Sequence, residues 1–137
     1  MPKQSRTRQV GAAQAQAYVG KAEEYLSAAV AELEAGRAIA ATSLAIHAGI
    51  NAADAVSGMR LGQRAAGQDH DEAIALLRTA GPDGMAVAKD LGRLLPMKAR
   101  AEYEPDDIPR SDAAKAVERA RRMVEVARRL AAAQRSR

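Results

Sequence analysis

Four polar side chains recur along one side of an otherwise apolar segment in the first half of the chain. Ser43, His47, Asn51 and Asp54 are spaced at i, i+4, i+8 and i+11, which places them on a single side of a helix. Each such group would cost roughly 1–3 kcal/mol if it were buried without a hydrogen-bond partner. The spacing therefore predicts a polar stripe that faces a wet cleft or a subunit interface. For His47 we expect a hydrogen bond between helices rather than a catalytic role.

A second group of polar residues opens the stretch from residue 97 to residue 110. Lys98, Arg100 and Tyr103 combine two cations with a phenol, and the stretch also contains two prolines and a run of acids. This combination suits either phosphate binding or the anchoring of a long connection to the rest of the fold. We favour the anchoring role and expect Tyr103 and Ile108 to be the apolar anchors.

Several other kinds of site are excluded by the residue types present. The chain has no cysteine, so it has no disulfide framework, no thiolate metal site and no cysteine nucleophile. The Glu-x-x-His pattern of di-iron bundles does not occur, and the Walker A, Gly-x-Gly-x-x-Gly and Gly-x-Ser-x-Gly motifs are also missing. We therefore expect neither a metal nor a cofactor.

The elements that must position these residues are helices. The 137 residues are 47% hydrophobic and rich in alanine, with no Phe, no Trp and 3 Tyr. Alanine favours helix, whereas β-branched and aromatic residues are too scarce for a sheet of several strands. The length suits one domain. No apolar run is as long as a membrane span, so we expect a cytoplasmic protein without a membrane partner.

Apolar periodicity predicts an all-α fold, an antiparallel bundle of four or five helices over residues 11–132. We expect a mobile basic tail at residues 1–10, a polar linker at residues 63–68, an irregular connection at residues 97–110 and a basic C-terminal tail at residues 133–137. The helices are expected at about residues 12–35, 38–59, 70–80 and 81–95. A last helix, capped by Ser111, is expected to reach about Ala132.

Charge is distributed unevenly along the chain. The net charge is +4, with the basic excess at both ends and an acidic middle. Basic ends can attract a polyanion such as RNA through counterion release. An arginine-rich helix is more often only a solvated face, and no aromatic residues alternate with the basic ones here.

Over roughly residues 15–130 the order of features resembles the HEPN superfamily (higher eukaryotes and prokaryotes nucleotide-binding). The resemblance rests on the small-residue run at 45–56, the Gly-containing linker ending in Asp69 and His70, the stretch from Leu94 through Lys98 to Tyr103, and the closing alanine-rich helix through residues 121–124. It implies an all-α bundle that usually dimerises. Many members are metal-independent endoribonucleases of toxin or defence type, and others are non-catalytic.

Active members of this superfamily carry an arginine followed, after four to six residues, by a histidine, and the pairs of two subunits meet across the dimer cleft. Arg64 and His70, with five residues between them, match this spacing. The resemblance thus implies that His70 is a base or acid for RNA cleavage and that Arg64 is the cation that stabilises the charge on phosphorus.

Two other functions stay open at the level of sequence. One is a non-catalytic dimeric adaptor or toxin–antitoxin partner, in which the polar stripe specifies the register of the dimer. The other is a basic nucleic-acid-binding module that uses the last helix. The expected partners are accordingly a second copy of the chain, RNA or a nucleotide, and an antitoxin-type protein.

Overall fold

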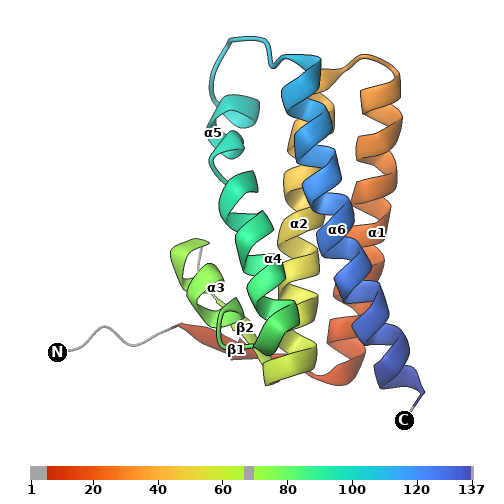
Figure 1. Ribbon diagram of the computed structural model, residues 1–137, viewed down its shortest axis with the longest axis vertical. Helices are drawn as coiled ribbons and strands as arrows, with labels where there is room; N and C mark the ends of the chain where they lie inside the picture. The colour runs from red at the N-terminus through yellow and green to blue at the C-terminus, as the bar shows by residue number, and fades with distance from the viewer. Residues whose placement is uncertain (1–5, 67–69, 137) are drawn as a thin grey trace, which may run out of the picture.

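A computed structural model describes residues 6–66 and 70–136, and these residues are largely helical (Figure 1). In chain order the elements are β1 (Thr7–Gln9), α1 (Ala12–Glu34), α2 (Ala38–Leu61), β2 (Gln63–Ala65), α3 (His70–Leu77), α4 (Gly81–Leu94), α5 (Met97–Glu102) and α6 (Arg110–Arg135). The predicted all-α bundle is confirmed.

The bundle is formed by α1, α2, α4 and α6, which alternate in direction along the chain (Figure 1). Helix α2 packs against α1, α4 and α6, while α3 and α5 lie on the side of α4. The helix α2 is also long and apolar enough to span a membrane. Most of it is buried by the other helices of the bundle, which is consistent with a soluble protein.

Small residues let the helices approach closely. Most buried positions of α2 are alanine or glycine, and the large buried side chains around it include Leu91, Leu94 and Met123. A Cβ atom added at Gly49 would lie 2.5 Å from Leu94 Cδ2, closer than such atoms can approach. The alanine bias therefore serves close packing as well as helix propensity.

Helix ends follow the glycine signals in the sequence. Gly36 and Gly62 have φ values of 81° and 69°, in the left-handed region that favours glycine after a helix. The start of α6 differs from the expectation. Its N-cap is Pro109, with no side-chain cap hydrogen bond, so the predicted Ser111 cap is wrong. Proline before the first turn already sets a suitable φ.

The prediction of a mobile tail is wrong for residues 7–10. β1 pairs antiparallel with β2, and Val10 N donates to Gly62 O over 2.9 Å. Val10 is only 6% exposed and packs where Gly58 leaves room for its side chain. This apolar contact and the strand hydrogen bonds anchor the segment, and β2 occupies half of the predicted linker. Residues 1–5 lie outside the described part of the chain.

Two further boundaries differ from the prediction. Residues 97–102 form α5, so the irregular connection is shorter than expected. Ile108 is buried, as predicted, whereas Tyr103 is 78% exposed and is not an anchor. At the C-terminus α6 continues to Arg135, because Gln16 and Arg135 hydrogen-bond over 2.6 Å and hold this turn against α1.

Candidate functional site

Two arginines lie directly opposite each other on the ribbon formed by β1 and β2. In the antiparallel register Arg8 pairs with Arg64, and directly opposed residues of two strands project from the same side of a sheet. Arg8 is exposed and Arg64 is half-buried. Neither forms an ion pair with any residue that the structure describes. The two like charges therefore repel each other, and no ion pair with a described residue neutralises either of them.

Arg64 is held in place by weak local contacts. Its Nη1 donates to Ala65 O over 2.9 Å, and its Cζ lies 5.9 Å from the centre of the Tyr18 ring on α1. The second contact is a cation–π interaction, which favours a fixed guanidinium over a mobile one. A guanidinium has five N–H donors, so this arrangement leaves most of them for a ligand.

Asp54, on α2, is a carboxyl group whose charge interacts with that of Arg64. Burial raises the pKa of Asp54 to about 6, and the positive charge of Arg64 acts in the opposite direction. The Asp54 carboxyl accepts no hydrogen bond from the described residues. It is therefore a group that can gain or lose a proton near neutral pH beside a fixed cation.

His47, another residue of the polar stripe on α2, lies between α1 and α5. Its ring stacks on Tyr25 with centroids 5.3 Å apart and an interplanar angle of 29°. Its Nε2 lies 3.8 Å from Glu102 Oε1 of α5, which is too long for a hydrogen bond. His47 thus has partners on two neighbouring helices, but the expected interhelical hydrogen bond is not formed.

The other members of the stripe have separate surroundings. Asn51 is buried, and its Nδ2 donates to His47 O of the preceding turn over 2.8 Å. Ser43 lines a groove of about 820 Å³ near the start of α2, together with Ile39 and Ala101. The stripe is therefore not one continuous cleft, and Asn51 is satisfied without a second subunit.

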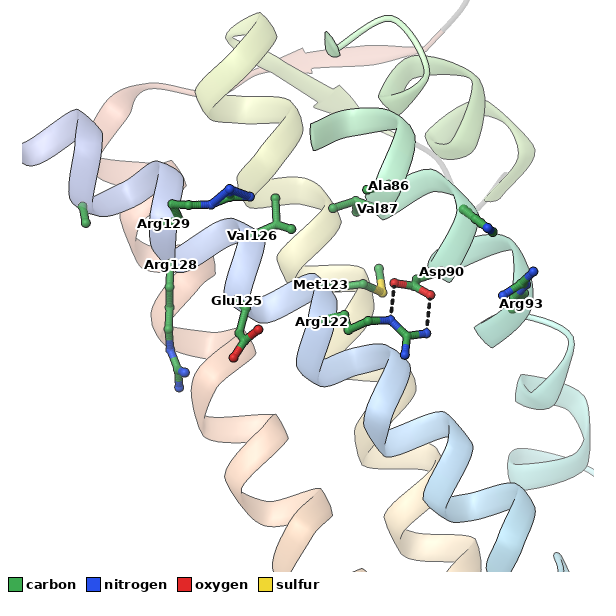
Figure 2. A pocket seen from close by; sticks show the side chains of 12 residues that line it. Ala86, Val87, Asp90, Arg93, Arg122, Met123, Glu125, Val126, Arg128 and Arg129 are labelled. Atoms are coloured by element: carbon green, nitrogen blue, oxygen red, sulfur yellow. Dashed lines mark hydrogen bonds and ion pairs between the residues drawn. The ribbon is translucent and has the colours of Figure 1, made fainter. Parts of the chain in front are cut away.

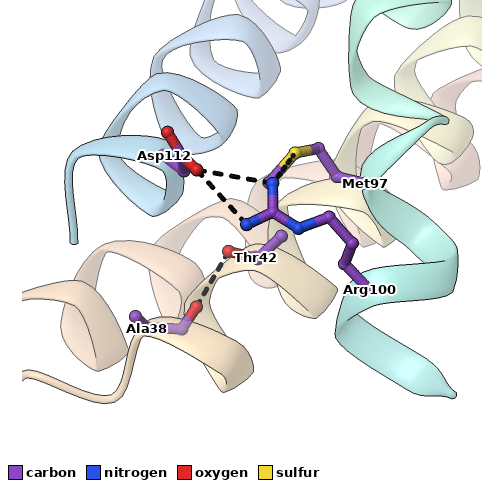
Figure 3. A network of polar contacts seen from close by, with 5 residues as sticks. All are labelled: Ala38, Thr42, Met97, Arg100 and Asp112. Atoms are coloured by element: carbon purple, nitrogen blue, oxygen red, sulfur yellow. Dashed lines mark hydrogen bonds and ion pairs between the residues drawn. The ribbon is translucent and has the colours of Figure 1, made fainter. Parts of the chain in front are cut away.

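Of the residues around α5, Arg100 has the role expected of a loop anchor. Arg100 Nη2 lies 3.3 Å from Asp112 Oδ2, and Nη1 lies 3.6 Å from Met97 Sδ (Figure 3). The ion pair joins α5 to the first turn of α6 across the connection. Lys98 is half-buried, and its side chain forms no hydrogen bond or ion pair with the described residues.

Arg64 and His70 lie on successive elements. Arg64 is the middle residue of β2, and His70 is the first residue of α3 and half-buried. Residues 67–69 between them lie outside the described residues, so Asp69 of the resemblance is not placed. The structure thus sets Arg64 on a strand beside α1 and α2, with His70 at the start of the next helix.

Sequence reasoning missed four residues of this region, namely Arg8, Tyr18, Tyr25 and Glu102. Arg8 was hidden because three residues are too few to show strand alternation. Tyr18 and Tyr25 are seven residues apart on α1, a spacing that marks one helix face but equally suits a core. Glu102 is one of several acids near α5, and nothing in the sequence distinguishes it.

Within residues 6–66 and 70–136, no three histidine or acidic side chains gather as a set of metal ligands. No protein-family model matches the chain, and no curated protein matches it in sequence. Membership of the HEPN superfamily therefore stays a prediction.

Proposed function

We propose that this chain is an RNA-binding protein of HEPN type that holds the RNA backbone at the ribbon site, defined as Arg8, Arg64, Tyr18 and Asp54. The observation that supports this most strongly is the pairing of Arg8 with Arg64 on one side of the ribbon. A phosphate between the two guanidinium groups would replace their repulsion with charge-assisted hydrogen bonds.

The fixed position of Arg64 supports binding rather than mere solvation. Tyr18 and the Ala65 carbonyl limit the freedom of Arg64 before a ligand arrives. Less conformational entropy is then lost on binding, which favours affinity. The net charge of +4 favours a polyanion over a single small anion, since each neutralised phosphate releases counterions.

Metal-independent cleavage of the bound RNA is a second step of the same proposal. The observation that favours it is the half-buried Asp54, whose pKa is raised to about 6 close to Arg64. Cleavage requires that a base take the 2′-hydroxyl proton and that an acid protonate the leaving 5′-oxygen. We assign these two roles to Asp54 and His70, while Arg64 stabilises the charge on the phosphorane.

A non-catalytic adaptor is the rival function. In that function the polar stripe of α2 would meet its counterpart across a dimer interface. Asn51 already bonds within α2, and His47 already contacts Tyr25 and Glu102 of its own chain. These side chains need no second subunit to satisfy them, so the adaptor function has less support.

Binding is tested with labelled single-stranded RNA in EDTA, with fluorescence anisotropy as the readout. Charged hydrogen bonds contribute about 1.5–3 kcal/mol, so we expect Arg8→Gln and Arg64→Gln each to raise the Kd by about tenfold or more. Arg121→Gln on α6 is the matched control, because Arg121 is exposed and its ion pair is with Glu118 of its own helix. Its Kd should stay close to that of the wild type.

Two results would contradict the ribbon site. Equal weakening by Arg121→Gln would favour a binding module on α6, and absence of RNA binding by the wild type would favour the adaptor. Cleavage is followed in the same samples. We expect His70→Ala to bind RNA without cutting it, whereas binding without cleavage by the wild type would restrict the function to binding.

A further inference from the structure

Helix α4 has a continuous exposed side that lies between α3 and α6 (Figure 1). Met85, Lys89 and Arg93 are spaced at i, i+4 and i+8, so they form one ridge along this side. Ala86 lies next to the ridge and is exposed as well. Met85 is 52% exposed, so a large apolar side chain is accessible in the middle of a basic surface.

The surface is hollowed where α4 meets the end of α3. A notch of about 470 Å³ lies there, lined by Arg78, Met85, Ala86, Ala88 and Lys89. No acidic residue of the described chain lines it. We define the α4 face as Arg78 with Met85, Ala86, Lys89 and Arg93. It combines an exposed apolar centre with cations from two helices.

The three cations of the α4 face have no neutralising partner. Arg78, Lys89 and Arg93 form no ion pair with any residue that the structure describes, and all three are exposed. A partner that brings carboxylates to these side chains would break no existing ion pair. The gain from the new charge pairs is then not offset by the loss of old ones.

The acids close to this face are already engaged or turned away. Asp90 of α4 accepts hydrogen bonds of 2.8 and 3.2 Å from Arg122 of α6, as Figure 2 shows. Asp83, the other acid of α4, bonds to arginines of α2 and α6. The Glu125 side chain on α6 points away from α4 in Figure 2. The positive charge of the α4 face is therefore left for a ligand.

The shape of the face suits a helix. A ridge with i, i+4 spacing packs into the groove between two such ridges of another helix. Gly92 lies on the same exposed side, and the nearest atom to a Cβ added there is 3.9 Å away, so a second backbone can approach closely. The eight residues from Met85 to Arg93 correspond to about 12 Å, or roughly two turns of a partner helix.

A protein segment suits this face better than RNA does. Surfaces that bind single-stranded RNA stack the bases on aromatic side chains, and the α4 face has no aromatic residue. Its apolar centre is Met85, and methionine is both enriched at protein interfaces and adaptable in shape. Carboxylates on one side of a helix recur at i and i+4, which is also the spacing of Lys89 and Arg93.

We propose that the α4 face docks an acidic amphipathic helix of another protein. An apolar side chain of that helix covers Met85, and its carboxylates accept hydrogen bonds from Arg78, Lys89 and Arg93. The α4 face contains no residue of the ribbon site. The proposal therefore stands or falls independently of RNA binding at Arg8 and Arg64.

Three labelled helical peptides of about 16 residues serve as probes. They share leucines on one side and differ only at the flanking positions, which carry Glu, Gln or Lys. Fluorescence anisotropy at low salt measures the Kd of each. The wild type should bind the Glu peptide about tenfold or more tightly than the Gln peptide, because its carboxylates form charged hydrogen bonds, and it should bind the Lys peptide most weakly.

The reversed variant Lys89→Glu/Arg93→Glu should instead prefer the Lys peptide. The control Lys115→Glu/Arg121→Glu makes the same change in net charge on the exposed side of α6 and should keep the wild-type preference. Met85→Ser should raise the Kd of the Glu peptide about fivefold or more, through loss of apolar contact. Circular dichroism checks the fold. Lys89→Gln/Arg93→Gln replaces the reversed variant if that variant unfolds, and should bind the Glu and Gln peptides equally.

Four results would overturn the proposal. Two of them are equal binding of the Glu and Gln peptides by the wild type, and a preference for the Glu peptide that persists in the folded α4 variants. The third is an RNA affinity that falls in the reversed variant but not in the control, which would assign the face to RNA. The fourth is a wild-type dimer that the reversed variant does not form, which would assign it to a second copy of the chain.

Discussion

At the scale of single residues, Asp54 is the group whose ionisation is most altered by the fold. Burial raises its pKa from 3.8 to about 6, so the folded protein retains a proton that the unfolded chain has already released. Ionisation of Asp54 therefore does not lower the free energy of unfolding below pH 4. It lowers this free energy progressively between about pH 4 and pH 6, and the full effect is present above pH 6. Because Asp54 is only half-buried, we expect a loss of about 1–2 kcal/mol.

The substitution Asp54→Asn removes this ionisation while keeping the size of the side chain. At pH 7 the free energy of unfolding of the variant should be about 1–2 kcal/mol higher than that of the wild type, so the variant is more stable. At pH 4 the two free energies should be equal. Urea titrations at both pH values measure the difference. Asp106→Asn on the exposed loop is the control. A variant that is less stable than the wild type at pH 7 would show that the ionised carboxylate stabilises the fold.

Residue types and spacing alone identified part of the candidate site around α2. The sequence placed His47 and Asp54 on one side of α2 because the 3.6-residue period is a local property. It could not show that Tyr25 and Glu102 reach His47, or that Tyr18 reaches Arg64, because these contacts join helices distant in the chain. Such contacts depend on the packing of the bundle, which no local pattern contains.

At the scale of elements, the long helices were predictable and the short elements were not. The bounds of α1 and α2 fall within two residues of the prediction, because each alanine-rich helical segment is followed closely by a glycine, Gly36 or Gly62. β1, β2 and α5 have three to six residues each and arise from tertiary contacts. Buried Val10 beside Gly58 is the contact that anchors β1.

Val10→Ala tests whether the ribbon is docked on the bundle. Val10 is 6% exposed, so removing two methyl groups should lower the free energy of unfolding by about 1–2 kcal/mol. Thr7→Ala, at an exposed position of the same strand, should change it by less than about 0.5 kcal/mol. Chemical denaturation measures both. Equal stability of the Val10→Ala variant and the wild type would mean that residues 7–10 behave as a loose tail.

The junction of α3 and α4 offers a matched pair of glycines on one helix. A Cβ atom at Gly84 would lie 2.2 Å from Leu77 O, whereas at Gly92 the nearest atom, Ile74 Cδ1, is 3.9 Å away. We expect Gly84→Ala to lower the free energy of unfolding by about 1–3 kcal/mol through overpacking. Gly92→Ala should raise it by up to about 1 kcal/mol through helix propensity. Thermal melting ranks the two variants, and the opposite order would contradict this close packing.

At the scale of the whole molecule, composition was sufficient for the fold class but not for the site. Abundant alanine and scarce β-branched residues predict a helical bundle, and this prediction does not depend on where each helix begins and ends. The ribbon site instead depends on an N-terminal strand returning beside the linker after α2, a long-range pairing without a sequence signal. For this reason Arg64 was identified through its spacing to His70, while its cross-strand partner Arg8 was not.

The salt dependence of RNA affinity tests the ribbon site most directly. For single-stranded RNA the slope of log K against log salt changes by about 0.7 for each phosphate contact. The double variant Arg8→Gln/Arg64→Gln should therefore have a slope shallower by about 0.7–1.4 than the wild type, because the two arginines hold one or two phosphates. Lys115→Gln/Arg121→Gln on α6 should leave the slope unchanged. An unchanged slope for the ribbon variant, with a shallower one for the α6 variant, would contradict RNA binding at Arg8 and Arg64.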